Sequence, residues 1–101
     1  MARTPEAKVK AQVRTILNQL IERGVPLYYF SPASNGYGRA GIPDFIGCIR
    51  GRFFSIECKA GKGTLTALQQ REANAIVKSE GMWYLADETT VDGLRTVLGS
   101  M

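Results

Sequence analysis

The sequence predicts a mixed α/β domain in which helices flank a β-sheet. Apolar residues recur at helical spacing in two long segments, 5–23 and 65–80. Short apolar runs that suit strands lie between these segments and after the second, separated by turn residues. A chain of 101 residues has room for one domain, 1–101, around one hydrophobic core. The predicted order of elements is α-β-β-β-α-β-α.

The first helix is predicted to begin at a threonine cap and to span residues 5–23. Thr4 suits the N-cap, Pro5 the first helical position, and Glu6 the positive end of the helix dipole. The apolar residues at helical spacing are Val9, Val13, Ile16, Leu17, Leu20 and Ile21. Gly24 can end the helix in the left-handed conformation that helix C-termini favour.

Four runs are predicted to be strands: residues 27–30, 45–49, 53–59 and 82–86. Arg50-Gly51-Arg52 reads as the tight turn of a hairpin between the second and third.

The segment before this hairpin, residues 31–43, is rich in glycine and proline and is predicted to be a loop. It contains Gly36, Gly38 and Gly41, which spell G-x-G-x-x-G. A dinucleotide-binding fingerprint must open a helix, whereas a strand follows here. The spacing therefore gives no support for a nucleotide-binding regulatory domain.

A second long helix is predicted over residues 65–80, ended by Gly81, and a short helix over 91–98 closes the chain. Thr66 and Gln69 have the spacing of a capping box, in which Gln69 bonds back to the helix start. Gln69 also shares a helix face with apolar residues, which would point it at the sheet. Both roles for Gln69 stay open.

The amino-acid composition limits the classes of function that the protein can have. Lys and Arg number 13 against 9 Asp and Glu, and this net charge of +4 favours an anionic partner, nucleic acid first. The absence of histidine excludes mechanisms that need a histidine base or ligand. No apolar run approaches the roughly 20 residues of a membrane span, and the charged N-terminus is unlike a signal peptide. We therefore expect a cytosolic protein without membrane contact.

The predicted hairpin brings charged side chains together. If Arg50-Gly51 is a two-residue loop, Asp44 lies opposite Glu57 on one face of the sheet. If the loop is Gly51-Arg52, Asp44 lies opposite Lys59 instead. Glu57 and Lys59 share a face in either case, because side chains alternate along a strand.

The same alternation separates the two cysteines, Cys48 and Cys58. Cys48 falls on the face of Glu57 and Cys58 on the other, so we expect no disulfide between them. Two thiols without histidine also cannot fill a zinc site within one chain. Each cysteine is predicted to be a small buried hydrophobe.

Asp44, Glu57 and Lys59 allow two interpretations, because charges between apolar strands are costly unless they are paired or bind a metal. The first is a structural ion pair of Lys59 with either carboxylate. The second is a divalent-cation site, since Mg²⁺ prefers one or two carboxylates plus water and phosphate oxygens. A lysine beside such an ion can stabilise developing charge or orient the attacking water.

The motifs resemble a known family. Ile42-Pro43-Asp44 and Ile56-Glu57-Cys58-Lys59 match the P-D…(D/E)-x-K pattern of the restriction-endonuclease-like superfamily. With Gly41 before them and Leu65-Thr66-Ala67-Leu68-Gln69 after them, they resemble the virus-type replication-repair nuclease (VRR-NUC) domain over residues 5–86. This resemblance implies a restriction-endonuclease-like fold and favours the metal site over the ion pair.

The resemblance also implies residue roles. The catalytic residues would be Asp44, Glu57, Lys59 and Gln69. The ligands of Mg²⁺ or Mn²⁺ would be Glu6, Asp44, Glu57 and the backbone carbonyl of Cys58. For Glu6 the alternative is a favourable contact with the helix dipole alone. Ala67-Leu68 departs from the family's usual proline and acid, which affects the helix start and not the site.

We therefore expect a metal-dependent endonuclease that hydrolyses DNA. Tyr37 and Arg39 are candidates to touch DNA, with a solvated loop as the alternative. By resemblance, short stand-alone domains cut branched DNA such as four-way junctions in pairs, which implies a homodimer in a bacterial or phage-infected cell. Residues 27–30 and 82–85 are rich in apolar side chains that suit a dimer interface. The alternative is that these side chains simply fill the core. The alternative function is a non-catalytic nucleic-acid-binding module with the same fold.

Overall fold

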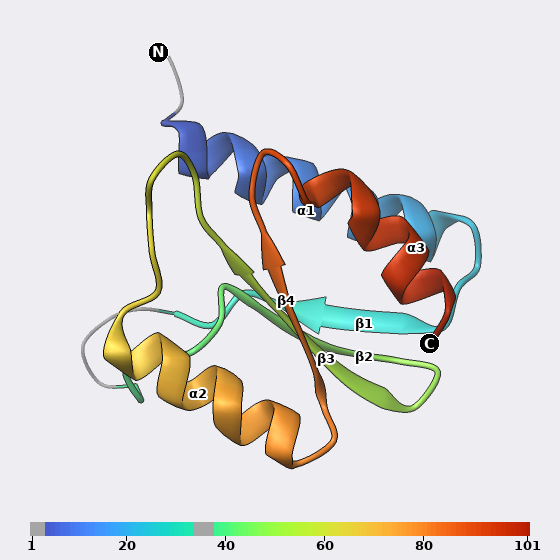
Figure 1. Ribbon diagram of the computed structural model, residues 1–101. Helices are drawn as coiled ribbons and strands as arrows, with labels where there is room; N and C mark the ends of the chain where they lie inside the picture. Colours follow the sequence, from blue (N-terminus) through green and yellow to red (C-terminus); the bar gives the residue numbers. More distant parts are fainter. Residues whose placement is uncertain (1–3, 34–37) are drawn as a thin grey trace.

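A computed structural model describes residues 4–33 and 38–101 and shows a sheet with helices on both faces (Figure 1). In chain order the elements are α1 (Pro5–Glu22), β1 (Leu27–Phe30), β2 (Phe45–Ile49), β3 (Arg52–Cys58), α2 (Ala67–Lys78), β4 (Met82–Ala86), a 3₁₀ turn η1 (Val91–Gly93) and α3 (Leu94–Gly99). The predicted fold class and element order are confirmed.

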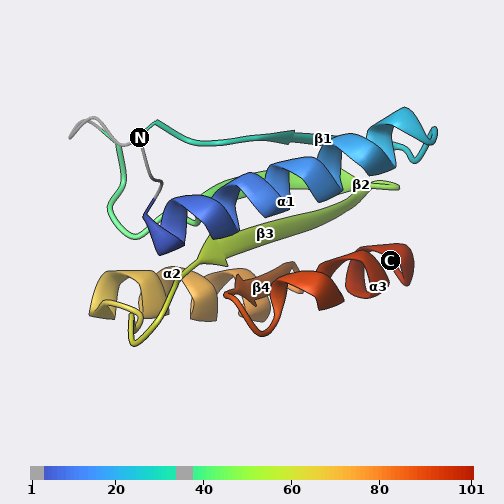
Figure 2. The same cartoon turned by 90° about the horizontal axis from the view of Figure 1, so that it is seen from above.

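The four strands lie in the order β1-β2-β3-β4. The first two pairs are antiparallel, whereas β3 and β4 are parallel and need a crossover, which α2 supplies. α1 and α3 lie on one face of the sheet, and α2 lies on the other, alongside β4 (Figures 1 and 2). Within the described part of the chain, no helix has the length and apolar character needed to cross a membrane.

The main core lies between α1, α3 and the sheet. The side chains that are almost completely buried there include Val9, Val13, Leu17, Phe45, Ile49, Phe54, Ile56, Leu94 and Leu98. α1 begins as predicted, with the hydroxyl of Thr4 accepting a hydrogen bond from the N–H of Ala7 at 3.1 Å. Gly24 follows the helix with a positive φ of 87°, which glycine adopts without strain.

The β2–β3 turn decides the register of the hairpin. Arg50 and Gly51 have φ of 49° and 82°, as in the two-residue turns that suit the twist of antiparallel strands. Ile49 therefore pairs with Arg52, and Phe45 pairs with Ile56. The predicted Arg50-Gly51 loop is confirmed, and the alternative loop at Gly51-Arg52 is wrong.

Some predicted boundaries are wrong. α2 begins two residues later than predicted, because Thr66 caps it and lies outside the helix. Its C-terminal left-handed residue is Glu80, with φ of 67°, and not Gly81. Gly81 is needed for space, because a Cβ there would lie 2.8 Å from a ring carbon of Phe53. The last predicted helix, 91–98, is a 3₁₀ turn that continues into α3.

The two cysteines differ in burial. Cys58 is fully buried as predicted, and burial raises the pKa of its thiol to about 12. Cys48 is exposed, so the prediction of a buried Cys48 is wrong. It points from β2 toward the face that carries α2, but α2 packs against β4 and leaves β2 uncovered there. Both thiols are free, as the predicted alternation requires.

Candidate active site

Asp44 immediately precedes β2 and is held by the neighbouring strand. Its Oδ2 accepts a hydrogen bond of 2.8 Å from the backbone N–H of Cys58. Its own backbone carbonyl accepts a bond of 2.8 Å from the hydroxyl of Ser31. These two contacts fix the aspartate at the end of the sheet where β2 begins and β3 ends.

Glu57 brings a second carboxyl to the same place. It is 3% exposed and points away from the face of Cys58. Burial, followed by contact with the Asp44 carboxyl, raises the pKa of Glu57 to about 8, although the charge of Lys59 opposes the shift. Within the described chain, no lysine or arginine forms an ion pair with Glu57. The structure thus joins Asp44 and Glu57 as the register predicts and leaves Glu57 without a paired cation.

Lys59 follows directly after β3 and is half-buried. Its backbone N–H donates to the carbonyl of Ala86 at 3.0 Å, which extends the parallel pairing with β4. Among the described residues its side chain pairs with neither Asp44 nor Glu57 within 4.0 Å. The structural ion pair considered from the sequence is therefore not formed.

Gln69 occupies both of the roles left open by the sequence. Its side-chain Oε1 accepts a hydrogen bond from the backbone N–H of Thr66 at 3.0 Å. The backbone N–H of Gln69 donates to the Thr66 hydroxyl at 3.1 Å, which completes the capping box. Its Nε2 lies 3.5 Å from Oε2 of Glu57, a long hydrogen bond. The start of α2 is thereby linked to the buried carboxyl.

Lys10 on α1 is a site residue that the sequence reasoning missed. Its Nζ lies 3.4 Å from Oδ1 of Asp44 and 3.6 Å from Oε2 of Glu6. Burial lowers the pKa of Lys10, but Asp44 and then Glu6 raise it by more, so the net shift is upward. The spacing of Glu6 and Lys10, one helical turn apart, predicts their ion pair, but nothing local in the sequence predicts the contact with Asp44.

The glycine-rich loop contacts α2 through Arg39 and Gly41. Arg39 donates to the buried carboxylate of Glu72 through Nε at 3.0 Å and through Nη2 at 3.1 Å. Gly41 packs so closely that a Cβ there would lie 2.4 Å from the carbonyl oxygen of Leu68. A pocket of about 380 Å³ between this loop and α2 includes Asp44 in its wall. Tyr37, the other predicted loop contact, lies outside the described residues.

The oxygen donors present fit a divalent ion that takes only a few of its ligands from the protein. Among the described residues, no three or more His, Cys, Asp or Glu side chains are grouped to hold a metal. The acids that meet are Asp44 and Glu57, whereas Glu6 is paired with Lys10. Two carboxylates are the number that Mg²⁺ commonly takes from a protein, with water and phosphate completing its shell. A buried carboxyl without a paired cation, such as Glu57, would be stabilised by that charge.

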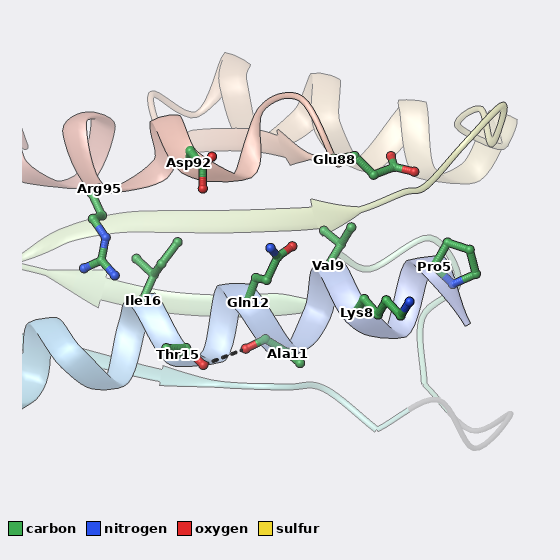
Figure 3. Close-up of a pocket in the computed structure, with 10 residues that line it drawn as sticks. All are labelled: Pro5, Lys8, Val9, Ala11, Gln12, Thr15, Ile16, Glu88, Asp92 and Arg95. Carbon is green, nitrogen blue, oxygen red and sulfur yellow. Dashed lines mark hydrogen bonds between the residues drawn. The ribbon is translucent and has the colours of Figure 1, made fainter. Parts of the chain in front are cut away.

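A larger groove of about 780 Å³ lies on another side of α1 (Figure 3). It runs between α1 and the segment 88–95. The charged residues that line it are Lys8, Arg95, Glu88 and Asp92. Its charges balance, and none of the predicted site residues lines it. Size alone therefore does not mark the candidate active site.

Comparisons with known proteins concern the family and the fold. The family described as archaeal Holliday junction resolvase (Hjc) matches residues 5–86. A solved structure described as a VRR_NUC domain superposes with a TM-score of 0.68 at 20% identity, covering 91% of this chain and 95% of that chain. At this identity the likeness shows the fold. No protein of curated function matches the sequence.

Proposed function

The chain belongs to the family of archaeal Holliday junction resolvases (Hjc) and has the VRR-NUC nuclease fold, and from this premise we propose that it is a divalent-metal-dependent endonuclease acting on branched DNA. The observation that carries the proposal is the meeting of Asp44 and Glu57 at one end of the sheet, with Glu57 buried and unpaired. A protein that only binds nucleic acid has no need of this costly arrangement.

Asp44, Glu57 and the backbone carbonyl of Cys58 are the proposed ligands of Mg²⁺ or Mn²⁺. When bound, such an ion polarises the scissile phosphate and steadies the leaving oxygen. Lys59, whose charge already acts on Glu57, would orient the attacking water or stabilise the negative charge that develops on the phosphate oxygens. Glu6, the further ligand that the resemblance implies, is paired with Lys10 through Oε2 at 3.6 Å.

Gln69 and the docked loop position these groups. The amide of Gln69 restrains the Glu57 carboxyl, and the contacts of Arg39 and Gly41 with α2 fix the loop that leads into Asp44. The net charge of +4 supplies attraction for the phosphate backbone, so binding should weaken as salt increases. We expect such an enzyme to act in the cytoplasm of a bacterial or phage-infected cell, where its DNA substrate lies.

We also propose that the protein acts as a homodimer, since two symmetric cuts require two centres related by a two-fold axis. The support from the structure is an uncovered part of the sheet. Tyr28, Phe30, Cys48 and Phe53 all point to the α2 face and are all exposed, because α2 covers only the β4 side of that face. Aromatic residues gathered on an open face are characteristic of a binding surface.

The nuclease proposal is tested with a four-way junction and a linear duplex, each with and without Mg²⁺ or Mn²⁺. Asp44→Asn and Glu57→Gln should each lower the cleavage rate at least ~100-fold while DNA binding persists. Asp92→Asn is the matched control, because Asp92 is an acid of the groove beyond α1. Junction binding without any metal-dependent cleavage by the wild-type protein would instead identify a non-catalytic binding module.

A further inference from the structure

The ammonium group of Lys10 joins α1 to the candidate active centre. It lies within 3.6 Å of two carboxylates, Glu6 one turn earlier on the same helix and Asp44 before β2. An exposed pair one turn apart on a helix contributes little to stability. The contact with Asp44 differs, because it connects two elements far apart in the sequence and both side chains are partly buried.

This contact occupies one oxygen of the proposed metal ligand. Oδ2 of Asp44 is already bound by the N–H of Cys58 at 2.8 Å, and Oδ1 is the oxygen that faces Lys10. A divalent ion bound at Asp44 and an ammonium group 3.4 Å from the same carboxylate would repel each other. Binding of the ion therefore requires the ammonium to move or to share the carboxylate at a cost.

We propose that Lys10 is the built-in counter-ion of the metal centre, which neutralises Asp44 until a divalent ion displaces its ammonium toward Glu6. This inference rests on the proposed metal site. In this arrangement Glu6 acts on the ion through Lys10, by holding the displaced ammonium, and not as a ligand. Lys10 thus competes with the ion for Asp44 and weakens metal binding to the free protein.

The test measures the dissociation constant of Mn²⁺ by calorimetry, without DNA or catalysis. Lys10→Met removes the competing charge and should bind Mn²⁺ roughly fivefold or more tightly than the wild type. Lys10→Arg keeps the charge and should stay close to the wild type. Lys8→Met is the matched control, because it removes an equal charge from α1 at a side chain that lies in the groove and not at Asp44.

A second comparison separates the two roles of Glu6. In the wild-type background, Glu6→Gln should weaken Mn²⁺ binding whether Glu6 is a ligand or holds the ammonium. In the Lys10→Met background, the same substitution should have no effect if Glu6 acts only through Lys10. A further loss of affinity in that background would restore Glu6 as a ligand and overturn its assigned role.

Two other outcomes are decisive. If Lys10→Met binds Mn²⁺ no more tightly than the wild type, or no more tightly than Lys8→Met, Lys10 is not a competitor for the site. That result leaves the nuclease proposal intact, provided that Asp44→Asn still abolishes Mn²⁺ binding. If the wild-type protein does not bind Mn²⁺ at all, the metal site and the inference about Lys10 both fail. Circular dichroism of each variant verifies the fold.

Discussion

The amide oxygen and the amide nitrogen of the Gln69 side chain serve different purposes. One caps a helix, and the other contacts the candidate site. Its carbonyl oxygen closes the capping box with Thr66, and its amide nitrogen reaches Glu57. A helix cap that also restrains a buried carboxyl connects local structure to chemistry through a single residue. Stability and activity should therefore respond differently when only one of these connections is removed.

Thr66→Ala and Gln69→Ala provide that comparison. Each removes part of the capping box and should lower the free energy of unfolding by about 1 kcal/mol. Thr66→Ala keeps the contact with Glu57 and should retain most of the cleavage activity, whereas Gln69→Ala should lose at least ~10-fold. Urea denaturation and single-turnover cleavage measure the two effects. Equal losses of activity in the two variants would mean that Gln69 matters only as a cap.

At this scale the sequence predicts the pair Asp44 and Glu57 well, because strand alternation and a two-residue turn fix their relation. The capping box of Gln69 follows from similarly local rules for the start of a helix. Lys10 could not be found in this way. Its contact with Asp44 depends on where α1 crosses the sheet, which is determined by the packing of the whole core.

Among the elements, the loop before β2 depends on close packing. Gly41 has a φ of 82° and rests against the backbone of the first turn of α2. Three residues later the chain reaches Asp44, so a shift of this loop would move the carboxylate. The bidentate pair of Arg39 with the buried Glu72 fastens the same loop two residues before Gly41.

Gly41→Ala and Gly51→Ala separate backbone strain from lack of space, since both residues have a φ of 82°. At Gly51 nothing lies within 4 Å of an added Cβ, so only strain of about 1 kcal/mol is expected. At Gly41 the contact with Leu68 should raise the loss of stability to roughly 2–4 kcal/mol and also lower cleavage. Chemical denaturation gives both values. Similar losses would show that the loop can move away from α2 without cost.

The end of α2 shows where element prediction fails. The pattern predicted a cap at Gly81, since glycine commonly takes the left-handed position. Glu80 takes that position instead, and Gly81 leaves room for Phe53 and Ile76. A glycine can be required by conformation or by the approach of a distant side chain, and only the assembled fold distinguishes the two.

Considered as a whole, the molecule covers the two faces of its sheet unequally. α1 and α3 lie over one face, whereas α2 lies beside β4 on the other and leaves β1 and β2 open (Figure 2). Alternation along the strands predicted which residues share the open face, but not that the face would be uncovered. This is why Cys48 was expected to be buried and is exposed.

We expect this open face to form the homodimer interface. Three exposed rings, those of Tyr28, Phe30 and Phe53, supply part of the roughly 800 Å² that each partner of a standard interface buries. β1 is an edge strand of the sheet, so its rim can extend the contact. The segment 82–85 is a weaker candidate, because its side chains are only partly exposed and two of them, Met82 and Tyr84, pack against the core.

Cys48 reports on this interface directly. Cys58 is buried and its thiol has a pKa of about 12, so a maleimide reagent should modify Cys48 alone. Its labelling rate should fall as protein concentration rises through the dimer dissociation constant, in parallel with the mass from light scattering. Tyr28→Lys places a charge in the face and should give a monomer with rapid labelling at every concentration.

Ile21→Lys is the control for that variant, because Ile21 is 41% exposed on α1, and α1 lies on the opposite face of the sheet. It should remain a dimer that makes paired cuts in a four-way junction, whereas Tyr28→Lys should make single nicks, since each monomer carries one carboxylate pair. A wild-type protein that stays monomeric at micromolar concentration, with labelling independent of concentration, would refute this interface. The carboxylate pair would then belong to a nuclease that cuts one strand in each encounter.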